Sequence, residues 1–501
     1  MSGGEARAVG VGSALTAPAP RPAEEASRLP TSEERELRLR VDRSSRRPVL
    51  VAFGCSLVAL LLGSVFGLTA SVQMHSPELA GPGWLTFGRV RTAHLNAMVY
   101  GWASLAMLGV SLWMIPRLVH QELKWARLAE FGVWIWALAL GYQLVRILGG
   151  IPSGMEWLEI GLYTGDTFLT VGGGMVGVAL LRTLLARAVP HLYVSVWYIM
   201  AALIWFPIIF ITGNWPAWTG AESAAVNWFY AHNALGLWLT AINVGAAYYL
   251  IPKVLGRPVY SYQLSLVGFW TLGFFYSLNG MHHVIGGPMP TWMITTSITA
   301  SVLMVIPVAA VAINHHMTVV GRFAALRYSP TLRFVVLGAM AYTAVSLQGI
   351  FTALREVNRI THFTQWTVGH AHVGVYAFAT LILFGSIYYI LPRVLRREWP
   401  SARLISWHFW LVLLGIALYV TALTVAGVFQ GLYLMDPAVP FRASVDVTLA
   451  GLQARSVAAV MLTAGHVVFA WHVWRLWRRP TPERELAPFH ALRPVVREAG
   501  S

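Results

Sequence analysis

Long uninterrupted apolar stretches, separated by short polar segments, fill the chain from Arg47 to Trp477. Most of them hold about 20 residues, the length at which a helix crosses the roughly 30 Å hydrocarbon core of a bilayer. Because the stretches are continuous and do not alternate, helices account for them without a membrane β-barrel. The pattern predicts an all-α, polytopic membrane bundle of about twelve transmembrane helices. The expected spans lie near residues 48–72, 93–115, 128–149, 160–185, 191–212, 225–250, 261–284, 290–314, 330–354, 365–391, 401–427 and 456–477.

The distribution of charge predicts the orientation in the membrane. The net charge of +15 and the pI near 10.2 could indicate a nucleic-acid partner. The arginines, however, gather in alternate loops, from Arg43 and Arg46 before the first span to Arg475 and Arg479 at the end of the last. By the positive-inside rule this predicts a multi-pass inner-membrane protein with both termini in the cytoplasm and no nucleic-acid partner.

The two ends of the chain differ from the apolar middle. Residues 1–46 are rich in Ala, Pro, Ser, Glu and Arg, so we expect a disordered cytoplasmic tail without a removable signal peptide. The transmembrane domain is expected over 47–478, followed by a cytoplasmic C-terminal tail at 479–501. The single cysteine, Cys55, permits neither an internal disulfide nor a two-cysteine copper centre.

Six of the sixteen histidines fall inside predicted spans near the outer side of the membrane. They are His94, His232, His282, His283, His370 and His372. An imidazole in hydrocarbon is costly unless it is paired or binds a metal, and a shared layer indicates a shared function. The other histidines, among them His315, His408, His466 and His472, are expected to have structural roles.

The spacing of these six residues suggests which groups they could bind. His370 and His372 are two residues apart, about 200° around a helix, so one helix could hold a haem on each face. His94 could be the second axial ligand of one haem, which leaves the other haem with an open side. The remaining three imidazoles could hold copper or iron with one coordination position free.

Four stretches around these histidines resemble subunit I of the cbb3-type (C-family) cytochrome c oxidases, in the haem-copper oxidase superfamily. They are WFYAHNA at 228–234, PVYSY at 258–262, GMHH at 280–283 and HFTQWTVGHAH at 362–372. The resemblance implies the subunit I fold and reduction of O2 to water, coupled to proton uptake and proton pumping.

The resemblance also implies a role for each ligand. His94 and His372 would bind a low-spin haem b, and His370 would be the proximal ligand of a high-spin b-type haem. His232, His282 and His283 would bind one copper ion. Because the chain lacks a Cys-x-x-Cys-His motif, the electrons would come through other subunits that carry c-type haem, from cytochrome c or a similar donor.

Tyr276 falls where this family has the tyrosine that is cross-linked to the copper ligand, here His232. Within the predicted span 261–284, Tyr276 lies seven residues before His283, which is about 700° or nearly two turns, so both side chains are expected to face the same way. Thr240, Tyr262 and Ser265 resemble the family's proton channel from the cytoplasm. Polar residues at helix interfaces are also common packing contacts.

Two charged groups are expected at the outer surface. Arg355 and Arg359 precede the His370 helix at the height of the haem propionates, and arginine pairs well with carboxylates. Glu156 and Glu159 resemble a Glu-x-x-Glu element whose first member, here Glu156, would contribute to a calcium site.

Two alternatives to an oxygen reductase remain. A nitric oxide reductase core shares the fold and the histidines, but in that group a glutamate one turn beyond the span-six histidine helps bind non-haem iron; here that position is Gly236. The oxidase family usually has a glutamate near the proximal ligand, where this chain has Gln348. This difference leaves open an unusual relative of the nitric oxide reductases. A transporter with a histidine proton relay would instead show histidines through the membrane depth and broken helices.

Overall fold

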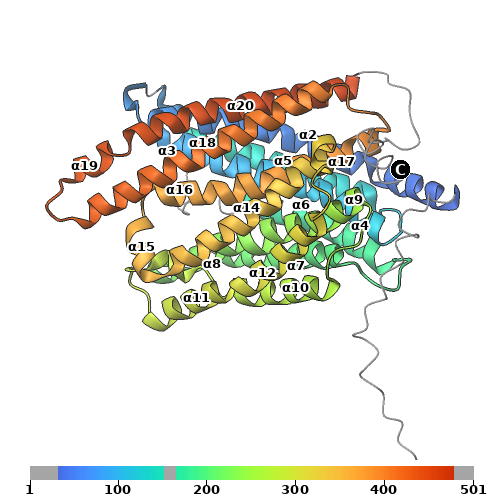
Figure 1. Ribbon diagram of the computed structural model, residues 1–501, viewed down its shortest axis with the longest axis horizontal. Coiled ribbons are helices and arrows are strands. Elements are labelled where there is room, and N and C mark those ends of the chain that lie inside the picture. Colours follow the sequence, from blue (N-terminus) through green and yellow to red (C-terminus); the bar gives the residue numbers. More distant parts are fainter. Residues whose placement is uncertain (1–31, 80, 152–164, 479–501) are drawn as a thin grey trace, which may run out of the picture.

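The computed structural model describes residues 32–79, 81–151 and 165–478. Within these ranges the regular structure is entirely helical (Figure 1). The main helices are α2 (Ser32–Gln73), α3 (Phe87–Asn96), α4 (Ser104–Leu118), α5 (Ala126–Gly149), α6 (Gly165–Leu185), α7 (Val194–Gly213), α8 (Gly220–Asn233), α9 (Ala241–Leu255), α10 (Tyr262–Ser277), α11 (Thr291–Leu303), α12 (Val305–Val319), α14 (Pro330–Ala353), α16 (Gln365–His372), α17 (Leu381–Leu395), α18 (Ala402–Met435) and α20 (Leu449–Arg478). Shorter helices are α13 (Ala325–Tyr328), α15 (Arg355–Thr361) and α19 (Phe441–Asp446).

Each of the twelve predicted spans contains a helix. Eleven continuous helical stretches in the described residues are long and apolar enough to cross a membrane. The remaining predicted span, 261–284, corresponds to α10, whose 16 residues fall short of that length. The chain is therefore a multi-pass membrane protein.

The helices run roughly parallel and pack as neighbours in one bundle (Figure 1). Three stretches, α3–α4, α8–α9 and α16–α17, are the most buried: 94%, 89% and 83% of their apolar windows lie inside, against 33–56% elsewhere. These three carry His94, His232 and the pair His370 and His372. The polar ligands therefore lie at the centre of the bundle.

All three central helices contain a π-helical segment directly after their histidines. These segments are η4 (Ala97–Ala103), η5 (Ala234–Thr240) and η7 (Val373–Thr380). A π segment holds one more residue per turn than an α-helix and is frequent at functional sites. It lets the outer and inner halves of one helix present different faces to the core.

The N-terminal boundary differs from the prediction. Helix α2 begins at Ser32, so the expectation of a disordered tail over 1–46 is wrong for residues 32–46. Within this stretch Asp42 receives two hydrogen bonds from the Arg117 guanidinium at the end of α4, which ties this part of α2 to the bundle. Residues 1–31 and the predicted C-terminal tail at 479–501 lie outside the described residues.

The predicted span 261–284 is also corrected. Helix α10 ends at Ser277, and His282 and His283 lie in a short 3₁₀ turn, η6 (Met281–Val284). Gly280, with φ of 119°, turns the backbone there, and a Cβ at this position would lie 2.8 Å from the carbonyl oxygen of Trp228. Because the helix ends first, helical register cannot relate Tyr276 to His283.

Candidate metal and haem site

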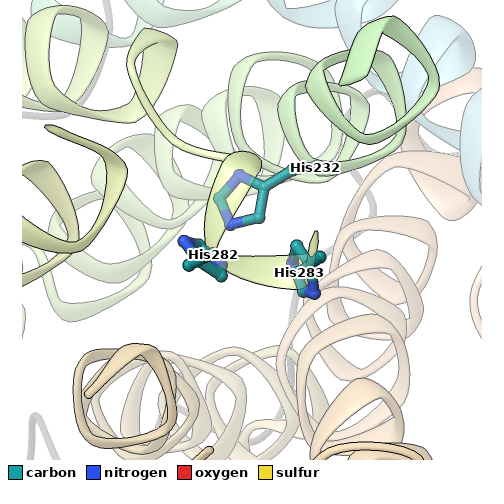
Figure 2. Close-up of side chains that lie close together, drawn as sticks. All are labelled: His232, His282 and His283. Atoms are coloured by element: carbon teal, nitrogen blue, oxygen red, sulfur yellow. The ribbon is translucent and has the colours of Figure 1, made fainter. Parts of the chain in front are cut away.

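Three imidazoles meet at the end of α8. One nitrogen from each of His232, His282 and His283 lies within 4.8 Å of the others. Their ring centroids are 4.7 Å apart for His232 and His282, 5.2 Å for His232 and His283, and 4.4 Å for His282 and His283. Figure 2 shows the three rings converging from α8 and the η6 turn.

The η6 turn is held by its neighbours rather than by a helix. Ser297 and Ser301 on α11 lie 3.2 and 3.0 Å from Nδ1 of His282, and Ser297 also accepts from the His282 backbone N–H. The His283 ring stacks on Trp228 at 4.4 Å. These contacts fix both rings before any metal binds, and they leave Nε2 of His282 free.

His362, in the turn before α16, supports the same turn from the other side. Its imidazole donates a hydrogen bond to the backbone carbonyl of His283. Burial lowers the pKa of His362, an effect that this hydrogen bond opposes. Neutral imidazoles with one nitrogen anchored and one free are suitable ligands for copper, zinc or iron.

Tyr276 lies against this cluster. Its ring centroid is 4.6 Å from that of His232. A Cβ built on Gly236 would lie only 1.9 Å from Cε1 of Tyr276 and 2.2 Å from Cδ1 and Cζ. Gly236, the position at which the sequence departs from the nitric oxide reductases, therefore provides the space that the phenol ring occupies. A glutamate at this position could not coexist with Tyr276 in this arrangement.

The three other histidines each have Nδ1 anchored. Nδ1 of His94 donates to the carbonyl of Gly63 at 2.7 Å, and Nδ1 of His372 donates to that of Val368 at 2.8 Å. Nδ1 of His370 donates to Oε1 of Gln348 at 3.2 Å. In each case Nε2 remains as the metal-binding atom, which fits axial ligation of haem iron.

The six histidines divide into two groups. His370 interacts electrostatically with all three members of the first cluster, whereas His94 interacts with His372. Since His370 and His372 come from opposite faces of α16, this division is the one that the two-residue spacing predicts. The donor set therefore fits two haems and one further metal.

Both expected arginines are exposed. Arg355 donates to Thr295 at 3.2 Å, and Arg359 pairs with Glu356 at 3.1 Å while its side chain stays 61% exposed. Glu156, the predicted calcium ligand, lies outside the described residues.

Sequence reasoning missed an arginine near the His94 and His372 pair. Arg455 on α20 is 9% exposed and acts electrostatically on both histidines. It hydrogen-bonds Tyr419, whose ring lies 4.4 Å from that of His372. Among the described residues no carboxylate pairs with it, and a buried arginine inside a membrane span would have been the signal that identified it.

The predicted proton-path residues lie near the start of α10 and at the end of η5. Tyr262 donates to the carbonyl of Leu192 at 3.0 Å, and Ser265 donates to that of Tyr262 at 2.5 Å. Thr240 ends η5. The hydroxyls of Tyr262 and Ser265 thus both donate to backbone carbonyls.

Additional buried polar groups lie near the start of α10 and near Tyr276. Asn314 on α12 donates to the hydroxyl of Tyr248 at 3.3 Å and to the carbonyl of Ser261 at 2.7 Å. Tyr342 on α14 interacts electrostatically with both Tyr248 and Tyr276. In the sequence these tyrosines resemble ordinary apolar-face residues, so only the fold connects them.

Comparison with known proteins identifies the family. The family model described as cytochrome c and quinol oxidase polypeptide I matches residues 47–463. The cbb3-type cytochrome c oxidase subunit CcoN1 of Stutzerimonas stutzeri is 32% identical over 440 residues, covering 84% of this chain and 93% of that protein. A cytochrome c oxidase subunit 1 homolog of Azorhizobium caulinodans is 31% identical over 450 residues, covering 85% of this chain and 80% of that protein.

A solved haem-copper terminal oxidase has the same fold, with a TM-score of 0.67 at 14% identity, covering 89% of this chain and 87% of that one. The chain belongs to the cytochrome c and quinol oxidase polypeptide I family. It is the catalytic subunit of an oxygen-reducing terminal oxidase, and the family implies haem and copper as its cofactors.

Both alternative functions are disfavoured. A nitric oxide reductase chain of Stutzerimonas stutzeri is a more distant relative, 25% identical over 399 residues, covering 74% of this chain and 81% of that protein. One expectation for a transporter is partly met, because His408, His466 and His472 are buried in the bundle away from the six ligands. The convergence of three imidazoles, and not an absence of other histidines, distinguishes the oxidase.

Proposed function

We propose that His232, His282 and His283 hold one copper ion and that His370 is the proximal ligand of a high-spin b-type haem facing it. The observation that carries this proposal is the convergence of three imidazoles beside Tyr276, with His370 in electrostatic range. His94 and His372 hold the second, low-spin b-type haem. When bound, the haem and copper supply the electrons and the coordination positions at which O2 is reduced to water.

The residues of this chain position and supply protons at that site. Ser297 and Ser301 orient His282, and Trp228 orients His283, so the imidazoles need little rearrangement. Tyr276 offers its phenolic proton and an electron beside His232. The Tyr276 ring occupies space that is open only because Gly236 has no side chain.

Protons reach Tyr276 from the cytoplasmic side. Thr240, Tyr262 and Ser265 contribute to this route, and the buried groups Tyr248 and Tyr342 extend it toward Tyr276. Uptake from that side lets the reaction store energy, which is the basis for coupling to proton pumping.

The outer surface binds the haem carboxylates and the partner subunits. Arg355 and Arg359 are candidates for the propionates, and the buried Arg455 is a further candidate beside the low-spin haem. Glu156 would contribute to a calcium site. Electrons come from subunits carrying c-type haem, with cytochrome c or a similar protein as donor, and the chain lies in the inner membrane with both termini in the cytoplasm.

Metal analysis of the purified complex, combined with turnover assays for O2 and NO, tests this assignment. We expect two haem irons and one copper per chain, with O2 as the preferred substrate. Iron without copper, together with NO reduction, would overturn the copper assignment. The variant His282→Ala should lose copper and retain the low-spin haem spectrum.

A further inference from the structure

A buried tyrosine and histidine form a hydrogen-bonded pair away from the metal site. Tyr376 lies in η7 and His466 on α20, and their side chains are 4% and 2% exposed. The Tyr376 hydroxyl is 2.6 Å from Nε2 of His466. On the other side of the ring, Nδ1 of His466 is 2.7 Å from Oγ of Ser64 on α2.

The neighbouring hydrogen bonds determine which residue of this pair is the donor and which is the acceptor. The Ser64 hydroxyl has a single proton and donates it to the carbonyl of Leu60 at 2.6 Å. It must therefore accept a hydrogen bond from Nδ1–H of His466. The neutral imidazole then has a lone pair on Nε2, and Tyr376 donates its O–H to it. The phenol thus already points its proton at a base.

Tyr376 is also close to the haem ligands along the chain. It follows His372 by four residues and His370 by six, so the axial separations are roughly 6 and 9 Å at helical rise. Four residues is about one helical turn, which keeps Tyr376 near the side of the helix that carries His372. An electron from Tyr376 can therefore reach the bound haems through one short helical segment.

Other buried tyrosines in the described residues lack this combination of a proton acceptor at the hydroxyl and a position close to the proposed haem ligands. Tyr419 is nearer to His372, at 4.4 Å between rings, but its hydroxyl faces the guanidinium of Arg455, which cannot accept a proton. Tyr100 and Tyr230 have hydroxyls with no hydrogen-bond partner. Tyr388 does face a histidine, with its hydroxyl 3.0 Å from Nδ1 of His408, but it lies twelve residues further along the helix.

We propose that Tyr376 is an auxiliary electron donor, with His466 as its proton acceptor, when O2 at the metal centre is only partly reduced and external electrons are scarce. Tyr376 then supplies one electron for the reduction of that oxygen, and its phenolic proton moves to Nε2 of His466. The products are a neutral phenoxyl radical and an imidazolium. An electron from the donor subunits later reduces the radical, and the proton returns to the oxygen.

This inference rests on the proposed haem ligation by His370 and His372. Electron paramagnetic resonance of the oxidised holo-complex after addition of hydrogen peroxide provides the test. We expect a tyrosyl radical, recognised by its narrowing when ring-deuterated tyrosine is incorporated. Tyr376→Phe should remove a component of that signal, because the ring stays and the hydroxyl is lost.

Matched variants separate this role from packing. Tyr388→Phe removes a comparable buried hydroxyl that also faces a histidine, and it should leave the signal unchanged. His466→Asn keeps polar groups beside the phenol but cannot accept its proton at neutral pH, so it should also remove the Tyr376 component. Tyr276→Phe, measured in parallel, identifies the part of the signal that comes from the tyrosine beside His232.

The outcomes are distinguishable. A radical signal that is the same in Tyr376→Phe and in the unmodified complex would overturn the proposal, as would an unaltered Tyr376 component in His466→Asn. Failure of the underlying haem assignment would be seen earlier, as missing low-spin haem absorbance before peroxide is added. Absorbance of every variant before treatment also excludes misfolding as the cause of a lost signal.

Discussion

The substitution Gly236→Ala adds one methyl group where Tyr276 now lies. That methyl carbon would be 1.9 Å from Cε1 of Tyr276, whereas two carbons normally approach to about 3.5–4.0 Å. The phenol ring must therefore move by roughly 1.6 Å or more. Overpacking of this kind costs about 1–3 kcal/mol of stability.

The displaced ring should reduce O2 turnover more than it reduces metal binding. A misplacement of about 1 Å at a reacting group can cost on the order of 100-fold in rate, so we expect a loss of that size. The nearest atoms to the new methyl all belong to Tyr276, so the three imidazoles should still hold copper. An oxygen electrode measures the rate, and elemental analysis measures the copper to haem ratio.

Two controls test the reasoning behind this prediction. Gly174→Ala places its Cβ where no atom lies within 4 Å, and it should leave both rate and copper content unchanged. The double variant Gly236→Ala, Tyr276→Ala removes the clash together with the phenol, and it should not recover turnover. Full O2 reduction by Gly236→Ala alone would refute the role assigned to the position of Tyr276.

Three further changes test the supporting contacts. Gln348→Leu leaves Nδ1–H of His370 without its acceptor, at a cost of about 1–3 kcal/mol, and should shift the iron–histidine stretching band in resonance Raman spectra; an unshifted band would contradict the contact. Ser301→Ala removes one of two hydroxyls from His282 and should weaken copper retention about 10-fold in a chelator titration, near the low end for such supporting residues. Arg117→Met strands a buried carboxylate on α2 and should destabilise the protein by about 3–5 kcal/mol. Thermal unfolding in detergent measures this loss, and a melting temperature equal to that of the unmodified protein would contradict it.

The helical bundle, and the division of the histidines between two proposed haem sites, could both be predicted from the sequence. Apolar length located all twelve helices, and the two-residue spacing of His370 and His372 separated the two haem sites. Both inferences depend on regular helix geometry, which holds along most of α16. The fold class and the family were predicted from these features and are confirmed by the comparisons.

Irregular backbone limited the remaining predictions. Helix α10 ends before His282, so the helical register between Tyr276 and His283 was a wrong argument even though Tyr276 does lie beside the cluster. The π segments were not visible in the apolar pattern, because one additional residue in a fully buried helix leaves hydrophobicity unchanged. Long-range partners such as Tyr342 and Arg455 depend on tertiary packing and could not be inferred from local spacing.

The three π segments have a consequence for how this chain tolerates insertions and deletions. Each one separates a first half-helix, which carries the proposed haem or metal ligands, from a second half-helix, which presents packing side chains. Deleting one residue within η7 would rotate the two halves relative to each other by about 100°, the angular step of one residue. Either the haem ligands or the packing face of the second half-helix would then point the wrong way. Each π segment therefore sets the rotation of one half of its helix relative to the other. A redesigned bundle with ideal α-helices would have to change the side chains on one side of each π segment.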